Sequence, residues 1–243
     1  MAYPKFKNKH LFETITHVDH EKTPLPENFP KKFIIFYSKN LLKYVKKKYK
    51  PKKITKLEHE SFEFYQYKDI GFVKIKGIGS PVSVIAFEHL IKWGGKTFLN
   101  IGYAGGLNEE GIFLCIKALR DEGTSYHYLP HGHFTFPSKE LTNKLGKYLK
   151  KNNSDYKKGI TWTIDAPYRE TREEINHFKK IGISTVEMES SALFAVAKLR
   201  KVKIASAFVV SDTFGKEWTP NYHKKNIKQS LYTLFDTAVD CLK

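Results

Sequence analysis

Cysteine is scarce in this chain of 243 residues. The two that occur, Cys115 and Cys241, lie far apart and form no Cys-x-x-Cys pair. A disulfide framework and a zinc knuckle both need closely spaced cysteines, so neither is expected. The composition therefore indicates a reducing compartment, and no metal or other cofactor is predicted.

Long apolar runs are also missing. Nowhere do about 18 consecutive apolar residues occur, which is roughly the length that a membrane-spanning helix needs. The first residues, 1–9, are basic, but no apolar segment of the kind found in a signal peptide follows them. We therefore expect a cytoplasmic protein with no membrane partner.

Acidic residues are outnumbered by basic ones, 25 against 42, which gives a net charge of +17. Such a charge attracts anions such as phosphate, nucleotides or nucleic acid. Most of the excess is lysine, spread along helices and termini as in segment 43–56. The charge does not follow the interleaved aromatic pattern of a common RNA-binding motif. The pattern favours a solvated lysine face over a nucleic-acid groove.

Several catalytic signatures are absent too. The chain has no Gly-x-Ser-x-Gly elbow, no His-Glu-x-x-His helix, no Walker A loop and no dinucleotide-binding glycine pattern. Serine hydrolase, zinc enzyme and nucleotide-binding Rossmann interpretations therefore have little support.

An apolar content of 41% and an aromatic content of 14% are those of a protein with a substantial core. Residues 1–31 are irregular and contain Pro24, Pro26 and Pro30, which predicts an N-terminal arm. Residues 32–243 then form one domain, because no repeat or low-complexity linker divides them.

Apolar runs and helical spacings alternate along this domain, which predicts an α/β fold: three α/β/α layers around a mixed, mostly parallel central sheet. The expected strands cover 33–37, 62–67, 71–76, 97–101, 112–118, 161–164, 184–186 and 203–210. The expected helices cover 41–49, 78–91, 138–151, 171–180, 190–199 and 226–242. Ligands of such sheets bind beyond the carboxyl ends of the strands, so the loops after 101, 164, 186 and 210 are the candidate sites.

The segment Val186-Glu187-Met188-Glu189 places two acids between a strand and an almost wholly apolar helix. In an extended segment Glu187 and Glu189 point to the same side, where carboxylate oxygens suit the vicinal hydroxyls of a ribose. Alternatively, the acids serve the N-terminus of the following helix, where negative charge is favourable.

A third acid, Asp212, follows Ser211 directly after the β-branched run 203–210. An aspartate at the end of a parallel strand suits a catalytic role, here protonating or hydrogen-bonding N7 of a purine as the base departs. An Asx turn or a helix cap is the alternative.

Two glycine-rich segments, 77–81 and 102–106, are expected to be turns whose backbone N–H groups approach an anion. Two further segments, 120–128 and 165–171, are rich in aromatic and hydrogen-bonding side chains. Their aromatics would either stack on a base or pack against another subunit.

The motifs Gly-x-Gly-x-Pro, Gly-x-Ala-Gly-Gly, Asp-Ala-Pro-Tyr, Val-Glu-Met-Glu-Ser and Val-Ser-Asp occur in this order. In content and in order they resemble the nucleoside phosphorylase and nucleosidase superfamily, from about Phe33 to the C-terminus. The resemblance implies a phosphorylase-like fold, a nucleoside substrate, cleavage of its N-glycosidic bond and a homo-oligomer, either a dimer or a hexamer.

The resemblance also implies roles for individual residues. Ribose would be bound by Glu189, with Met188 and Glu187 beside it and His10 reaching from the arm of a neighbouring subunit. The base would be bound by Ser211, Asp212, Pro167, Tyr168, Ala104 and Gly105, and Asp212 favours a purine. The side of the phosphate or water would comprise Gly79, Lys39, Asn100 and Tyr103.

Three departures from the family pattern fall on the phosphate side. Tyr37-Ser38-Lys39-Asn40 stands where phosphorylases have Gly-Asp-Pro-x-Arg, Asn100 stands for an arginine, and Tyr103 stands for a serine or threonine. Each lost charged hydrogen bond weakens an anion site by about 1.5–3 kcal/mol, and Lys39 restores only a point charge. Phosphorolysis, with inorganic phosphate as co-substrate, is the first prediction; hydrolysis and non-catalytic nucleoside binding are the alternatives.

Overall fold

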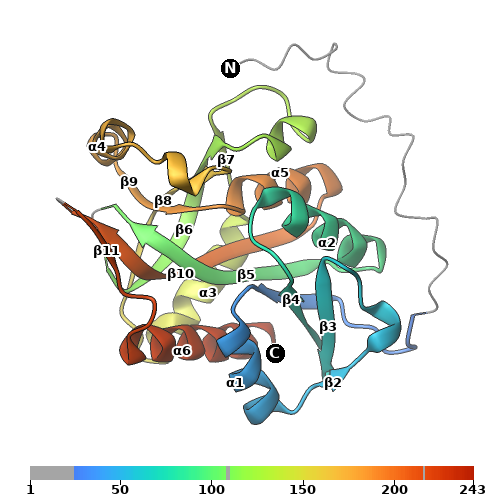
Figure 1. Cartoon of the computed structure of the whole chain (residues 1–243). Helices are drawn as coiled ribbons and strands as arrows, with labels where there is room; N and C mark the ends of the chain where they lie inside the picture. Colours follow the sequence, from blue (N-terminus) through green and yellow to red (C-terminus); the bar gives the residue numbers. More distant parts are fainter. Residues whose placement is uncertain (1–24, 108–109, 216) are drawn as a thin grey trace.

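A mixed β-sheet runs through the centre of the computed structural model, with helices on both of its faces (Figure 1). The structure describes residues 25–107, 110–215 and 217–243. The α/β class and its three layers are therefore confirmed. The strands are β1 (Lys32–Phe36), β2 (Lys52–Lys53), β3 (Phe62–Tyr67), β4 (Ile70–Ile75), β5 (Thr97–Gly106), β6 (Ile112–Asp121), β7 (Phe134–Thr135), β8 (Tyr156–Ile164), β9 (Ile183–Glu187), β10 (Lys203–Phe214) and β11 (Trp218–Pro220).

Strand β5 connects two parts of this sheet. On one side it pairs in parallel with β1, from which β4, β3 and β2 continue outwards. It also pairs in parallel with β10 and, at Gly105 and Gly106, antiparallel with β9. Since β10, β6, β8 and β9 are neighbours in turn, these strands and β5 close into a ring. Each strand of the ring therefore has a pairing partner on both sides in the described part of the chain.

Six helices cover the sheet in the described part of the chain. Helices α1, α3 and α6 pack on one face, and α2 and α5 pack on the other, while α4 lies beside β9 (Figure 1). Their bounds are α1 (Lys39–Tyr49), α2 (Ser80–Lys92), α3 (Lys139–Lys151), α4 (Arg172–Lys180), α5 (Ser190–Arg200) and α6 (Lys225–Leu242). None of the helices in the described ranges combines the length and apolarity that a bilayer-spanning segment needs.

Hydroxyl side chains begin three of these helices. Ser38 accepts a hydrogen bond from the Leu41 backbone N–H at 3.2 Å, and Ser138 starts α3 in the same way. Thr171 and Glu174 form a reciprocal capping box at the start of α4. Such caps satisfy N–H groups that have no partner within the helix, which fixes where each helix starts.

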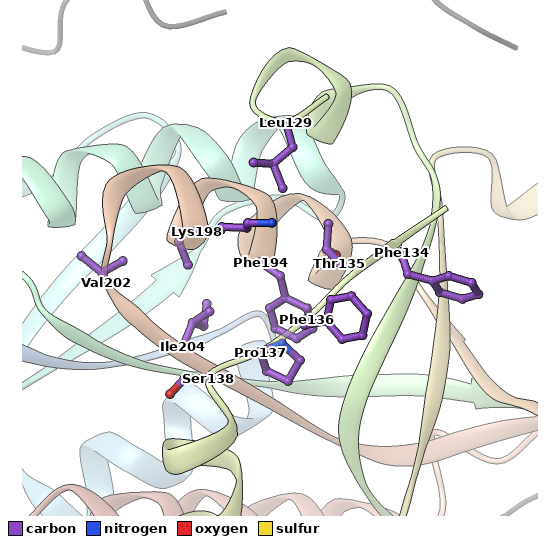
Figure 2. A pocket seen from close by; sticks show the side chains of 11 residues that line it. Leu129, Phe134, Thr135, Phe136, Pro137, Ser138, Phe194, Lys198, Val202 and Ile204 are labelled. Atoms are coloured by element: carbon purple, nitrogen blue, oxygen red, sulfur yellow. The ribbon is translucent and has the colours of Figure 1, made fainter. Parts of the chain in front are cut away.

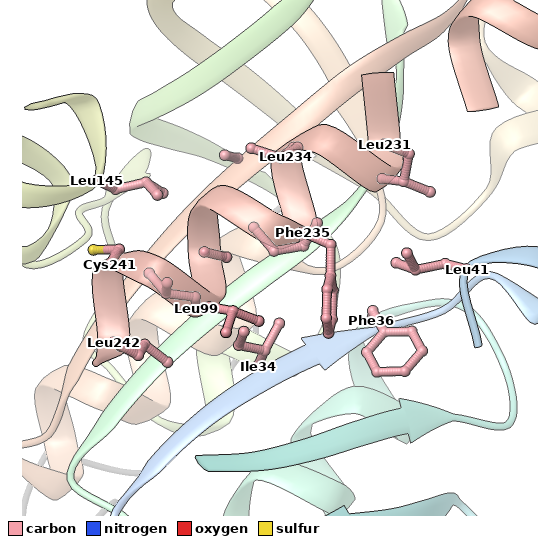
Figure 3. Packing of buried hydrophobic residues seen from close by; sticks show 14 of the residues in the cluster. Ile34, Phe36, Leu41, Leu99, Leu145, Leu231, Leu234, Phe235, Cys241 and Leu242 are labelled. Carbon is pink, nitrogen blue, oxygen red and sulfur yellow. The ribbon is translucent and has the colours of Figure 1, made fainter. Parts of the chain in front are cut away.

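Aromatic rings meet within the mainly aliphatic core under α1, α3 and α6. The ring of Phe235 on α6 meets Phe36 edge-on, with centroids 5.4 Å apart (Figure 3). It also meets Phe72 edge-on, with centroids 5.1 Å apart. On the other face, Phe33 stacks on Phe98 at 5.2 Å beneath α2 and α5. All of these rings are buried, and those from the sheet come from β1, β4 and β5, so both cores depend on this part of the sheet.

The glycine segment 102–106 is not the turn that its composition predicts. It continues β5 as far as Gly106, because β9 and β10 offer hydrogen-bonding partners on both sides. A Cβ atom on Gly105 would lie 2.7 Å from Cε2 of Phe214 and 3.1 Å from Oδ2 of Asp212. The glycine is needed here for close approach of neighbouring strands rather than for a turn.

Strand β10 is likewise longer than expected. It passes the predicted end at Val210, shifts register by a bulge between Val210 and Asp212, and continues to Phe214. A bulge re-aims the side chains that follow it. Asp212 therefore comes from within a strand and not from a loop.

Truncating a buried aromatic residue tests the packing of the core. We expect Phe235→Ala to lower the free energy of unfolding by about 3–5 kcal/mol, since it removes a buried ring and leaves a cavity. The matched control is Phe136→Ala, whose side chain is 61% exposed. Urea unfolding measures both, and equal losses would contradict the assignment of Phe235 to the core.

Candidate functional site

A cavity of about 630 Å³ opens at the carboxyl ends of β1, β5, β9 and β10. This is where a sheet of this kind binds its ligands. Ten of the residues predicted from the sequence line it: Tyr103, Ala104, Gly105, Pro167, Tyr168, Glu187, Met188, Glu189, Ser211 and Asp212. Segments far apart in the sequence thus meet at one cavity.

Glu187 lies at the end of β9 and is almost fully buried. One carboxylate oxygen accepts a hydrogen bond from the Thr163 hydroxyl at 2.6 Å. The other accepts from the backbone N–H groups of Glu189 and Ser190, at 3.0 and 2.8 Å, where α5 begins. Burial raises the pKa of Glu187, while these hydrogen bonds oppose the rise. For Glu187 the helix-terminus interpretation is therefore correct.

Unlike Glu187, Glu189 does not cap α5, since its side chain makes no hydrogen bond to the start of that helix. Its Oε1 accepts a hydrogen bond from the backbone N–H of Gly79 at 2.6 Å. Burial, followed by the nearby charge of Glu187, raises the pKa of Glu189 to about 8. Two buried acids this close hold at least one proton between them near neutral pH.

The loop before α2 holds this second acid in place. Gly79 has φ +101°, a backbone conformation that glycine adopts without strain, and the next hydroxyl, on Ser80, donates to the carbonyl of Met188 at 2.7 Å. Gly79 is buried and is not among the residues that line the cavity. Its N–H group is used to hold Glu189 rather than to bind an anion directly.

Asp212 faces the cavity from β10 with both carboxylate oxygens engaged. Oδ1 accepts from the Ser211 hydroxyl at 2.7 Å, and Oδ2 accepts from the indole N–H of Trp218 on β11 at 2.8 Å. The antiparallel pairing of β10 with β11 brings Trp218 to this position. The two donors fix the orientation of the carboxylate.

The loop that follows β8 forms another wall. The carboxylate of Asp165 accepts the Gly123 N–H at 2.8 Å, and a short 3₁₀ turn, η5 (Pro167–Arg169), comes next. Tyr168 is fully exposed at the rim of the cavity. Glu170 lines the same wall, and burial together with the charges of Asp212 and Glu174 raises its pKa to about 7.

On the side predicted for phosphate, Asn100 is buried behind the wall. Its side-chain oxygen accepts the Tyr37 hydroxyl at 2.9 Å, and its NH₂ group donates to Ser206 at 3.1 Å. Lys39 is exposed at the start of α1 and lies outside the cavity lining, whereas Tyr103 is part of it. In the described residues, no lysine, arginine or histidine side chain lines the cavity.

Comparison with known proteins agrees with this geometry. The family model of the phosphorylase superfamily matches residues 33–243. This chain belongs to that superfamily. Among curated members, the DeoD-type purine nucleoside phosphorylase of Exiguobacterium sp. is 25% identical over 180 residues, which cover 68% of this chain and 73% of the relative.

Solved structures of other superfamily members share the fold. Purine nucleoside phosphorylase from Toxoplasma gondii, in complex with immucillin-H, superposes with a TM-score of 0.76 at 18% identity, covering 88% of this chain and 91% of its own. AMP nucleosidase from Bacteroides thetaiotaomicron gives 0.72 at 20% identity, covering 89% and 90%. At these identities the likeness establishes the fold alone.

Several residues that line the cavity were not assigned roles from the sequence, among them Tyr37, Glu170, Phe214 and Trp218. Tyr37 and Glu170 lie within segments that the sequence did single out. Phe214 and Trp218 follow the expected end of β10, so no local pattern indicates them. His10, predicted to complete the sugar site of a neighbour, lies outside the described residues.

Residues 120–128 have a structural role, because their side chains hold the loop after β6 in place. The buried guanidinium of Arg120 donates to the carbonyls of Pro130 and Gly132, at 2.8 and 3.2 Å, and to the hydroxyl of Ser125. Glu122 accepts from the Ser191 hydroxyl at 2.6 Å. These bonds hold the loop after β6 against α5, away from the cavity lining.

A second cavity, of about 250 Å³, lies between α5 and β7 (Figure 2). Its lining is mainly apolar, including Phe134, Phe136 and Phe194, with Lys198 as the charged member. It contains none of the predicted site residues. Within the described ranges, no three His, Cys, Asp or Glu side chains are grouped so as to hold a metal ion.

The close approach at Gly105 can be tested by adding one methyl group. Gly105→Ala would press on Phe214, Val186 and Asp212, so we expect a loss of about 1–3 kcal/mol in the free energy of unfolding. The control is Gly132→Ala, where the nearest atom lies 3.8 Å from the added carbon. Chemical denaturation compares the two, and a Gly105→Ala chain as stable as the control would contradict the packing described here.

The raised pKa of Glu189 makes a prediction about stability. Its value of about 8 in the fold exceeds the ordinary 4.5, so the fold favours the neutral acid. Stability is then fully present below pH 4.5 and is lost as pH rises towards 8. Glu189→Gln should remove this loss and raise the free energy of unfolding at pH 8 by about 1–3 kcal/mol.

Denaturation of wild type and Glu189→Gln at pH 5 and pH 8 checks this expectation. The control is Glu173→Gln, since Glu173 is exposed in the first turn of α4. If the free energy of unfolding of Glu189→Gln falls with pH as steeply as that of the wild type, ionisation of Glu189 does not destabilise the fold.

Proposed function

We propose that this chain hydrolyses the N-glycosidic bond of a purine nucleoside, releasing the base and free ribose. As a superfamily member it is an enzyme of the nucleoside phosphorylase and nucleosidase kind. The finer assignment rests on one observation. The cavity wall carries four carboxyl side chains, on Glu170, Glu187, Glu189 and Asp212, and no cationic side chain among the described residues.

The two buried acids, Glu187 and Glu189, are placed to bind the ribose. Glu187 is held by Thr163 and the start of α5, while Glu189 uses one carboxylate oxygen on Gly79. No side chain in the described ranges donates to Glu189, which lines the cavity, so its carboxyl group is available to the vicinal hydroxyls of ribose. As the C1′–N bond breaks, the ribose becomes oxocarbenium-like, and the nearby carboxylates stabilise its positive charge.

Asp212 suits the base. The bond-breaking step leaves the electron pair on the nucleobase, and the neutral form of Asp212 neutralises it by donating its proton to N7 of a purine. The water that attacks C1′ gives up one proton, which restores the neutral form of Asp212. Ser211 and Trp218 orient the carboxylate for this contact. The purine assignment is further supported by the relative from Exiguobacterium, which is named as a purine nucleoside phosphorylase.

Water is the nucleophile that this wall favours. A phosphate dianion about 6 Å from one ionised carboxylate is repelled by about 3 kcal/mol per unit charge at an effective dielectric constant near 20. The side chain of Asn100 is already hydrogen-bonded to Tyr37 and Ser206, and Lys39 lies outside the cavity lining. Water carries no charge and meets no such barrier. The fold also occurs in a protein named as a nucleosidase.

Phosphorolysis is the second candidate, with inorganic phosphate as co-substrate. It is favoured by the curated relative, which is named as a phosphorylase. This reaction would need cations from outside the described lining, such as those of another subunit in the predicted homo-oligomer.

Product analysis separates the two reactions. We expect base release from inosine, adenosine or guanosine at the same rate with and without phosphate, and mass spectrometry should find free ribose carrying oxygen from labelled water. Ribose 1-phosphate, formed only when phosphate is present, would replace hydrolysis by phosphorolysis. The absence of release from any purine or pyrimidine nucleoside would favour a nucleoside-binding protein.

Two substitutions test the site itself. Glu189→Gln and Asp212→Asn should each lower kcat/KM by about 100-fold or more, because each removes charge stabilisation at the reacting bond. Asp155→Asn is the control, since Asp155 is exposed on the loop before β8. Circular dichroism establishes that the variants are folded. Full activity in both variants would show that the chemistry lies elsewhere.

A further inference from the structure

Glu170 lines the cavity but has no role in the proposed chemistry. It follows the η5 turn, which is closed by a hydrogen bond from the Arg169 N–H to the Ala166 carbonyl at 2.8 Å. The next residue, Thr171, caps α4. The backbone is therefore fixed on both sides of Glu170, and its half-buried side chain lines the cavity.

The acids around Glu170 are already committed to other partners. Glu174 accepts from the backbone N–H and the hydroxyl of Thr171, at 3.0 and 2.8 Å. Asp212 accepts from Ser211 and Trp218. By contrast, none of the side chains or N–H groups in the described ranges donates a hydrogen bond to Glu170. It is the acceptor that remains available to a ligand.

Its electrostatic surroundings point the same way. Burial, Asp212 and Glu174 all disfavour the ionised form, which is why the pKa of Glu170 rises to about 7. No cationic side chain in the described lining offsets these effects. A ligand N–H group that donates a hydrogen bond to Glu170 stabilises the ionised carboxylate, which no cationic side chain of the described lining does.

We propose that Glu170 is a specificity-determining residue of the base subsite. It accepts a hydrogen bond from an N–H group of the nucleobase, either an exocyclic amino group or a ring imino group. Bases that carry such a donor are thereby selected over bases that lack one. This inference rests on the proposed function, because the base is placed by its contact with Asp212, whose charge acts on Glu170 from the same cavity.

Matched nucleosides test the selection. Adenosine carries a 6-amino group, guanosine carries a 2-amino and a ring N–H group, and purine riboside carries no N–H donor on its six-membered ring. Glu170→Gln should reduce kcat/KM for adenosine or guanosine by about 10- to 100-fold, the range for a lost charge-assisted hydrogen bond. Purine riboside should change by less than about 2-fold, a shift too small for a lost hydrogen bond.

Two further variants make the result specific. Glu170→Asp keeps the charge but retracts it by one methylene group, so it should recover part of the selectivity if it reaches the base. Glu173→Gln changes an exposed acid of α4 outside the cavity and should leave all three substrates unaffected. Equal losses for purine riboside and the donor-bearing nucleosides would show a merely structural role and overturn the proposal.

The pH dependence gives a readout that packing alone would not move. With a pKa of about 7, Glu170 becomes ionised as pH rises through neutrality, and its preference for N–H donors should rise with it. The charged groups facing it are Glu174 on α4 and Asp212 on β10, and Glu187 and Glu189 line the same cavity. The adenosine to purine riboside ratio should therefore climb between pH 6 and 8 in wild type and stay flat in Glu170→Gln.

Equilibrium binding separates this inference from the proposed reaction. Calorimetry with free adenine and free purine needs no turnover. Tighter binding of adenine by wild type, lost in Glu170→Gln, would support the base subsite even if no nucleoside is cleaved. Equal affinity for both bases in wild type, or binding of neither, would overturn the proposal even if nucleosides are hydrolysed.

Discussion

The site depends on keeping two carboxyl groups out of water beside each other. Glu187 and Glu189 are both buried, and burial alone would drive each to its neutral form. The fold opposes this with the Thr163 hydroxyl from β8, the first N–H groups of α5 and the N–H of Gly79 before α2. Three elements must therefore converge at one place, and the ring of strands around β5 fixes their relative positions.

The distribution of charge separates the surface from the cavity. The chain carries a net charge of +17, yet the described lining of its cavity holds carboxyl groups and no cation. Lysines exposed on the surface, such as Lys39 at the start of α1, lie outside this lining. The long-range field of the protein thus draws anions towards it, while the local field within the cavity favours neutral or proton-donating ligands. Overall charge is consequently a poor guide to the ligand of this site.

The sequence predicted those parts of the site that lie within short motifs. Glu187, Glu189 and Asp212 stand at the ends of apolar runs, where an acid is conspicuous. Residues 102–106 were misread as a turn, because only the contacts of Gly105 with Val186 and Phe214 explain why glycine continues a strand. Trp218 could not be found, since its contact with Asp212 depends on the pairing of β10 with β11. The buried state of Asn100 likewise follows from its partners Tyr37 and Ser206, which are distant in sequence.

The indole of Trp218 gives the protein an optical reporter of its own. Of the three tryptophans, Trp162 is fully buried and Trp93 packs against Phe29 and Phe62, whereas Trp218 lines the cavity. Its N–H group is bonded to Asp212, the residue proposed to contact the base. A ligand that engages Asp212 alters the surroundings of this one fluorophore while the other two remain as a constant background. Occupancy of the cavity can therefore be followed by emission from the unlabelled chain.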